Sequence, residues 1–117
     1  MEHDLYERIL KYSKNLIIFI NSIKITFINK NLIEQLLRSW TSVWANYSEA
    51  NGAMSKNDFK NKIHIARKEI QETYYWLELL KEMNLNEDQK NKIKSIIDET
   101  NQLTKIFNKI THTLRNK

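Results

Sequence analysis

The chain has 117 residues, enough for one domain with one hydrophobic core, and 28% of them are charged and 41% hydrophobic. It contains one glycine, no proline and no cysteine, so β-hairpin turns lack their usual residues, and disulfides and cysteine metal sites are excluded. The net charge of +5 favours acidic partners such as nucleic acid, although a value this modest also occurs where charge only maintains solubility. We expect one all-α domain over residues 1–117.

Apolar residues recur at helical spacing in four segments, at about 4–24, 31–50, 56–83 and 87–115. Short connections between four such helices predict an up-down-up-down four-helix bundle. The predicted core positions are Leu5, Ile9, Leu16, Ile20 and Ile23; Ile33, Leu36, Trp40, Val43, Tyr47 and Ala50; Phe59, Ile63, Ala66, Ile70, Thr73, Leu77 and Leu80; and Ile93, Ile96, Thr100, Leu103, Phe107, Ile110 and Leu114.

The first segment is expected to begin at Asp4, whose side chain suits a helix N-cap. The β-branched run 25–28 resembles a strand but has no partner strand, so we expect it to be a helix tail or a connector. Either Asn29 or Asn31 is expected to cap the second helix.

Three further helix ends have candidate capping residues. Gly52 is expected to end the second helix in the left-handed conformation, which glycine adopts without steric cost. Ser55 with Asp58 predicts a capping-box variant at the start of the third helix, and Asn86 predicts the N-cap of the fourth.

No residues suited to catalysis or metal binding stand together in the sequence. Four-helix bundles bind metals through Glu-x-x-His pairs, but Asn61 and Lys109 stand three residues before His64 and His112. The core positions carry no acid or histidine, and no glycine-rich loop surrounds a serine. We expect no enzyme activity, catalytic residue, metal or cofactor.

The longest uninterrupted apolar run, residues 16–20, is far shorter than the roughly 20 residues needed to span a bilayer. It is also too short for the core of a signal peptide. We therefore expect a cytoplasmic protein that makes no membrane contact.

Basic residues form a row opposite the apolar positions of the fourth helix and a group at the start of the third. A row of this kind suits contact with phosphates, and a helix N-terminus itself attracts anions. Glu87 and Asp98 lie in the same row, and a mixed-sign exterior is also usual for a bundle, so both interpretations stay open. The candidate RNA- or DNA-binding residues are Lys56, Lys60, Lys62, Lys90, Lys94, Lys105, Lys109 and Arg115.

The third helix carries a second apolar stripe about a quarter turn from the first. A monomer would expose this stripe, so we expect homo-oligomerisation. The aromatic residues of the second and third helices suit core and interface packing better than base stacking. The candidate interface residues are Ile65, Trp76, Leu79, Met83 and Trp44.

An ordered set of residues between Leu32 and Leu80 resembles a known family, and the rest of the chain resembles it in pattern only. The family is the bacterial four-helix bundle proteins encoded within intervening sequences of large-subunit ribosomal RNA genes. The residues that carry the resemblance are Gln35–Ser39, Thr41–Val43, Ala45, Asn46, Glu49, Ala50, Ser55, Asp58, Phe59, Lys62, Ile65, Ala66, Lys68, Glu69, Glu72, Thr73 and Tyr75–Leu77.

The resemblance implies a ring-like homopentamer without established catalysis. Relatives of the family include Avd, the accessory variability determinant of diversity-generating retroelements, which binds a reverse transcriptase and nucleic acid. The resemblance therefore implies either a bundle that binds RNA or a nucleoprotein, or an accessory scaffold for a reverse transcriptase. Trp40 and Trp44 stand where the family tends to have alanine or glycine, so packing or the pentamer contact is expected to differ in detail.

Overall fold

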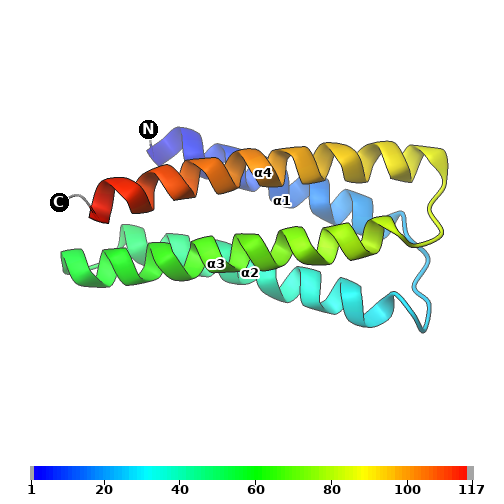
Figure 1. Cartoon of the computed structure of the whole chain (residues 1–117), viewed down its shortest axis with the longest axis horizontal. Helices are drawn as coiled ribbons and strands as arrows, with labels where there is room; N and C mark the ends of the chain where they lie inside the picture. Colours follow the sequence, from blue (N-terminus) through cyan, green and yellow to red (C-terminus); the bar gives the residue numbers. More distant parts are fainter. Residues whose placement is uncertain (1, 116–117) are drawn as a thin grey trace.

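The computed structural model describes the backbone of residues 2–115 and the side chains of residues 4–114. Four helices form the described chain, and it contains no strand: α1 (Glu2–Asn21), α2 (Lys30–Asn51), α3 (Lys56–Lys81) and α4 (Glu87–Arg115). Successive helices run antiparallel, with α1 and α4 on one side of the bundle and α2 and α3 on the other (Figure 1). The bundle measures 46 × 24 × 20 Å. This is the predicted up-down-up-down arrangement.

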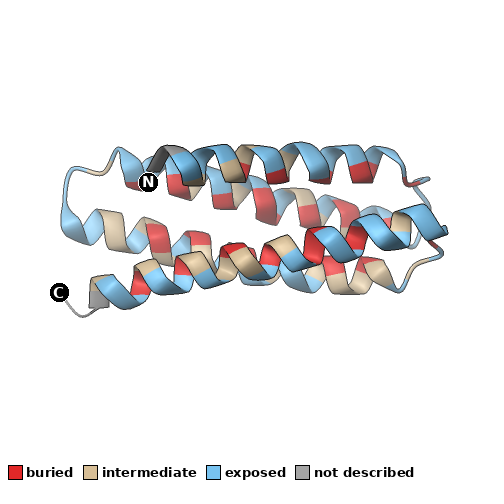
Figure 2. Ribbon diagram, turned by 90° about the horizontal axis from the view of Figure 1, so that it is seen from above, coloured by how far each residue is buried: buried red, intermediate tan, exposed pale blue. Residues whose placement is uncertain are grey.

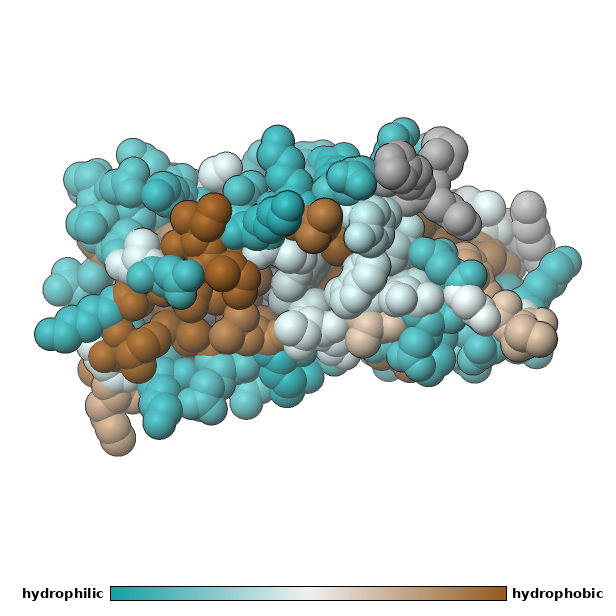
Figure 3. Space-filling view, turned by 180° about the vertical axis from the view of Figure 1, so that it is seen from behind, coloured by the Kyte–Doolittle hydropathy of each residue, from teal (hydrophilic) through white to brown (hydrophobic). Residues whose placement is uncertain are grey.

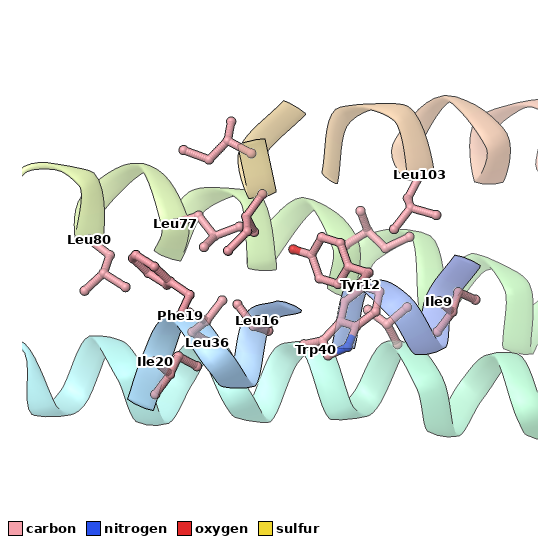
Figure 4. Close-up of a cluster of buried hydrophobic side chains, with 14 of the residues drawn as sticks. Ile9, Tyr12, Leu16, Phe19, Ile20, Leu36, Trp40, Leu77, Leu80 and Leu103 are labelled. Atoms are coloured by element: carbon pink, nitrogen blue, oxygen red, sulfur yellow. The ribbon is translucent and has the colours of Figure 1, made fainter. Parts of the chain in front are cut away.

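The predicted core positions of α2 and α3 are buried, apart from Phe59, which is half-buried. Buried residues form one stripe along each helix, directed into the bundle (Figure 2). In α1 the core also includes Tyr12 and Phe19, which the predicted pattern omits, and both lie in the cluster that α1 forms with leucines of the other three helices (Figure 4). Burial of a large apolar side chain stabilises a fold by about 1.5–3 kcal/mol, so these stripes account for the association of the helices.

Two pairs of hydroxyl groups lie in the buried interior. Tyr12 Oη lies 2.6 Å from Thr100 Oγ1, and the Thr100 hydroxyl is directed at the carbonyl of Ile96. Tyr12 is therefore the donor to Thr100, because a hydroxyl has one proton. Between α2 and α3, Ser39 Oγ lies 2.8 Å from Thr73 Oγ1. Each buried hydroxyl thus has a partner, which removes the cost of burying it.

Two predicted caps are confirmed. Ser55 Oγ accepts a hydrogen bond from the Asp58 backbone N–H at 3.1 Å. At the start of α4, Asn86 Oδ1 accepts from the N–H of Gln89 and Gln89 Oε1 accepts from the N–H of Asn86, which is a reciprocal capping box.

Other helix ends differ from the prediction. The first helix begins at Glu2, so Asp4 lies in its first turn instead of capping it. It ends at Asn21, where the Ser22 side chain and backbone N–H both donate to the Phe19 carbonyl. Gly52 has φ −100°, so the left-handed conformation predicted for it is wrong. Its N–H donates to the Glu49 carbonyl, which extends the helix end with an ordinary turn.

The 22–29 connector is organised by Asn29. Its Oδ1 accepts from the Thr26 N–H at 2.8 Å, and its Nδ2 donates to the Lys24 carbonyl at 3.0 Å. Asn29 is the N-cap residue of α2 by position, but its side chain stabilises the connector instead of capping the helix. Residues 25–28 form a connector, as expected, and the side chains of Ile25, Phe27 and Ile28 are exposed.

Among the described residues, no helix combines the length and apolar character required to cross a membrane.

Candidate functional site

The predicted basic row lies on the outer face of α4. Lys90, Lys94, Lys105 and Lys109 are all exposed, and Lys90 Nζ lies 3.5 Å from Glu87 Oε1. The side chain of Arg115, the last residue predicted for this row, lies outside the described residues.

The group predicted at the start of α3 divides between two sides of the helix. Lys62 Nζ contacts Glu49 Oε1 of α2 at 3.3 Å, so this lysine is directed towards α2 and its charge is compensated. Lys56 is exposed and Lys60 half-buried, and neither has an ion pair among the described residues.

Antiparallel packing brings together two stretches that contain no acidic residue. Residues 59–68 of α3 and 100–114 of α4 carry lysines, arginine and histidines but no aspartate or glutamate. Arg67 Nη1 donates to Asn108 Oδ1 at 3.4 Å, which shows that the two stretches lie side by side. We call the basic residues here the α3–α4 basic surface, which comprises Lys60, Arg67, Lys105 and Lys109.

Arg67 has few partners for a guanidinium group. Its Nε atom is buried and has no hydrogen-bond partner among the described atoms, and its contact with Asn108 is long. Arginine favours paired hydrogen bonds to a carboxylate or phosphate, and none of the described ion pairs includes Arg67. Sequence reasoning did not select Arg67, although its acid-free neighbourhood was visible in the sequence.

The other half of α4 has mixed charge. Lys90 pairs with Glu87 and Lys92 with Asp88, the latter at 3.2 Å. Asp98 is exposed on the same helix. The predicted row is therefore strongly positive only along the half that adjoins the start of α3.

The predicted interface residues lie on two different surfaces. Trp44 borders a groove between α1 and α2 of about 290 Å³, and its side chain is 38% exposed. This side of the bundle carries hydrophobic residues gathered towards the 22–29 connector (Figure 3). We call this surface the α1–α2 groove, and its principal residues are Tyr6, Leu10, Ile17, Leu37 and Trp44.

The remaining interface residues lie on α3 or, in the case of Met83, just after its end. Ile65 is exposed, whereas Trp76, Leu79 and Met83 are half-buried. Together with two glutamates of the same helix they form what we call the α3 strip: Ile65, Glu69, Glu72, Trp76, Leu79 and Met83.

Charged groups hold the α3 strip beside α2. Arg38 of α2 contacts Glu69 at 3.3 Å and also pairs with Glu72. Trp76 Nε1 donates to Glu72 Oε1 at 3.3 Å. Partial burial acts to raise the pKa of Glu72, but hydrogen bonds from Arg38 and Trp76 and the positive charge of Arg38 outweigh it and lower the pKa. Glu72 therefore stays negatively charged at neutral pH.

A cavity of about 580 Å³ lies at the end of the bundle that contains the α2–α3 turn. Its walls are mainly apolar and include Leu5, Phe59 and Ile110, while Asp4 and Lys109 stand among its polar residues. The described residues contain no group of three or more acidic, histidine or cysteine side chains placed to hold a metal ion.

Comparison with known proteins identifies the family. A family model described as "23S rRNA-intervening sequence protein" matches residues 2–109. The chain belongs to the 23S rRNA-intervening sequence protein family. No curated protein matches it.

A solved structure supports the membership. The chain is similar to a crystal structure of a protein of unknown function from the S23 ribosomal protein family of Bacteroides thetaiotaomicron VPI-5482. The two share 34% sequence identity with a TM-score of 0.69, and the match covers 91% of this chain and 93% of that one. The bundle is therefore similar over nearly its whole length to an experimentally determined fold.

Proposed function

We propose that this chain is a non-enzymatic, homopentameric four-helix bundle that binds RNA or a nucleoprotein through the α3–α4 basic surface. One observation supports it most directly: two acid-free stretches, distant in sequence, lie side by side and place Arg67 and lysines together. Phosphates are acceptors that suit the lysines and the Nη groups of Arg67, whose Nη1 makes only a long contact with Asn108. Membership of a family named for ribosomal RNA intervening sequences agrees with this proposal.

The proposal predicts a strong salt dependence. Each phosphate that a lysine or arginine neutralises releases counterions, and the slope of log K against log salt is about −0.7 per contact for a single strand. Contact through Lys60, Arg67, Lys105 and Lys109 therefore gives a slope of about −3. Fluorescence anisotropy of a labelled RNA at several salt concentrations measures it.

A pair of matched variants tests the position of the site. We expect Lys105→Glu with Lys109→Glu to weaken RNA binding at least about tenfold, because each substitution removes a phosphate contact and adds repulsion. Lys90→Glu with Lys94→Glu changes the net charge equally on the mixed-charge half of the same helix and is expected to have a much smaller effect. Equal losses of RNA affinity in the two double variants would show that binding depends on net charge and not on the position of the lysines. No binding of RNA or DNA at low salt would overturn the proposal.

The pentamer is proposed from the family resemblance, and the two apolar surfaces support self-association. Light scattering is expected to give five times the chain mass of 14.1 kDa. A mass equal to one chain would contradict this part of the proposal.

A second candidate function is an accessory scaffold of the Avd type that binds a reverse transcriptase. The observation that favours it is the connector at one end of the bundle, where Phe27 is 100% and Ile28 69% exposed, because protein partners bury apolar surface of this kind. A reverse-transcriptase gene and a template repeat beside this gene would support it, and an isolated reading frame within a ribosomal RNA gene would argue against it.

A further inference from the structure

We infer, on the basis of the proposed RNA binding, that the α3–α4 basic surface takes single-stranded RNA and that Tyr74 stacks on an unpaired base. Three features of the described residues carry this: the isolation of the Tyr74 ring, its alignment with Arg67 and the directions of the nearby carboxylates.

Tyr74 differs from every other tyrosine and tryptophan of α2 and α3. Each of the others has a ring contact; Tyr75 and Trp76, for example, lie with their ring centroids 5.1 Å apart. Tyr74 is 37% exposed, and it has neither a ring contact nor a hydrogen bond among the described residues. The exposed part of its ring is therefore available to a ligand.

Tyr74 lies on the side of α3 that adjoins α4. Arg67 marks that side, because its Nη1 donates to Asn108 of α4 at 3.4 Å. Lys60, Arg67 and Tyr74 follow one another at intervals of seven residues, close to two helical turns, so they share one side of α3. Because α4 runs antiparallel to α3, Asn101 stands at the level of Tyr74, as Asn108 does at the level of Arg67 (Figure 1).

Three of the carboxylates nearest to this surface in sequence are directed towards other helices. Glu69 and Glu72 both pair with Arg38 of α2. Glu99 pairs with Arg8 of α1 at 2.6 Å. These three glutamates therefore leave the side between α3 and α4 free of negative charge.

The remaining carboxylates set the limits of the surface. Asp58 precedes Lys60 by two residues, and side chains two residues apart on a helix do not face each other. Glu78 follows Tyr74 by four residues, and Asp98 stands at about the same level of α4, so a phosphate backbone would meet repulsion beyond Tyr74. From Lys60 to Tyr74 the surface is about 21 Å long at 1.5 Å per residue, which corresponds to about six steps of a stacked strand.

This order of groups favours a single strand over a duplex. Arg67 and Lys105 suit phosphates, while the Tyr74 ring presents a π-face to a base. The exposed amide of Asn101, at the same level, suits the edge of that base. In an RNA duplex the bases are paired and stacked on one another, so side chains reach mainly phosphates and 2′-hydroxyls, and Tyr74 meets no free base.

Substitution of Tyr74 tests the role of its ring. In fluorescence anisotropy we expect the wild-type protein to bind an unstructured oligouridylate more tightly than an RNA duplex of the same length. Tyr74→Ala should weaken binding of the oligouridylate about tenfold, because it removes the stacking of one base, and should change duplex binding less than about twofold. Tyr74→Phe keeps the ring and should retain the wild-type affinity. Phe27→Ala removes a ring that is 100% exposed in the connector, and this matched control should change neither affinity.

Photocrosslinking locates the stacked base directly. Single-stranded RNA that contains iodouridine is expected to crosslink to Tyr74 on irradiation, and mass spectrometry of the digested protein identifies the modified residue. Crosslinks confined to residues outside the α3–α4 basic surface would contradict the inference.

The results distinguish single-strand recognition from RNA binding itself. If the wild-type protein prefers the duplex, or if Tyr74→Ala weakens both RNAs equally or neither, RNA binding stands but the inference is overturned. An equal loss of affinity in Tyr74→Phe and Tyr74→Ala would show that the hydroxyl and not the ring makes the contact, which also overturns it. If the wild-type protein binds neither RNA at low salt, the proposed function fails together with the inference.

Discussion

At the scale of single residues, Trp40 and Trp44 lie one turn apart on α2 but have different environments. Trp40 is buried, its Nε1 donates to Ser13 Oγ at 2.7 Å, and its ring centroid lies 4.2 Å from that of Tyr12. Trp44 borders the α1–α2 groove and contacts the rings of Tyr6 and Tyr47. The first indole is therefore part of the core, and the second forms part of an exposed surface.

This difference predicts unequal effects of the same substitution. Trp40→Phe removes a partly buried hydrogen bond and leaves a small cavity, so we expect a loss of about 1–3 kcal/mol in the free energy of unfolding. Trp44→Phe is expected to cost less than about 0.5 kcal/mol, as is usual for an exposed position. Urea unfolding followed by circular dichroism measures both. Similar losses of stability in Trp40→Phe and Trp44→Phe would contradict the assignment of Trp40 to the core and of Trp44 to an exposed surface.

The candidate site was only partly predictable from residue types. The spacing of lysines on the fourth helix placed Lys105 and Lys109 correctly on its exposed face, because helical periodicity determines which side a residue occupies. It could not show that Lys62 pairs with Glu49, or that Arg67 lies beside Asn108, because these contacts join different helices. Such pairs depend on which helices are neighbours and on their relative rotation.

At the scale of the helices, the 22–29 connector is ordered by side chains in a segment that contains no glycine or proline. Asn29 is buried and bonds to the backbone at Thr26 and Lys24. Gln89 Nε2 donates to the Ser22 carbonyl at 2.6 Å, which attaches the start of α4 to the connector. The turn between α1 and α2 is therefore stabilised by amide side chains.

Removal of one amide should destabilise this connector selectively. We expect Asn29→Ala to reduce the free energy of unfolding by about 1–3 kcal/mol, because it removes a buried side chain together with its hydrogen bonds to the Thr26 N–H and the Lys24 carbonyl. Hydrogen exchange of the Thr26 amide should accelerate, since its acceptor is lost. Asn31→Ala changes an exposed asparagine two residues away and is the control, with an expected effect below about 0.5 kcal/mol. Equal effects at both positions would argue against the role assigned to Asn29.

Helix interiors were more predictable than helix ends. The repeats of three and four residues identified the buried face of α2, because hydrophobic burial enforces that period along a helix. The ends depend on competition between local hydrogen bonds, and at Ser22 and Gly52 ordinary turns took precedence over the expected continuation or left-handed cap. Tyr12 and Phe19 fit the same spacing of three and four residues between Ile9 and Ile23, so the sequence did carry a signal for these two core positions.

At the scale of the whole molecule, the arrangement leaves two unlike apolar surfaces on either side of α2. If these surfaces associate, folding and assembly are linked, because subunit binding stabilises the folded state by mass action. We therefore expect the midpoint of thermal unfolding to rise when the protein concentration is increased a hundredfold. Differential scanning calorimetry at the two concentrations measures the shift. A midpoint independent of concentration would indicate that the unfolding unit is the single chain.

The position of the α3–α4 basic surface near one end of the bundle has a consequence for affinity. In the proposed pentamer, cyclic symmetry makes all copies point the same way, so their basic surfaces are repeated around the ring at the same level along its axis. A single RNA strand that binds one copy then meets the next at high effective concentration. Weak contacts with individual phosphate groups would add up to avidity, and a short RNA that reaches only one copy would bind far less tightly than a long one.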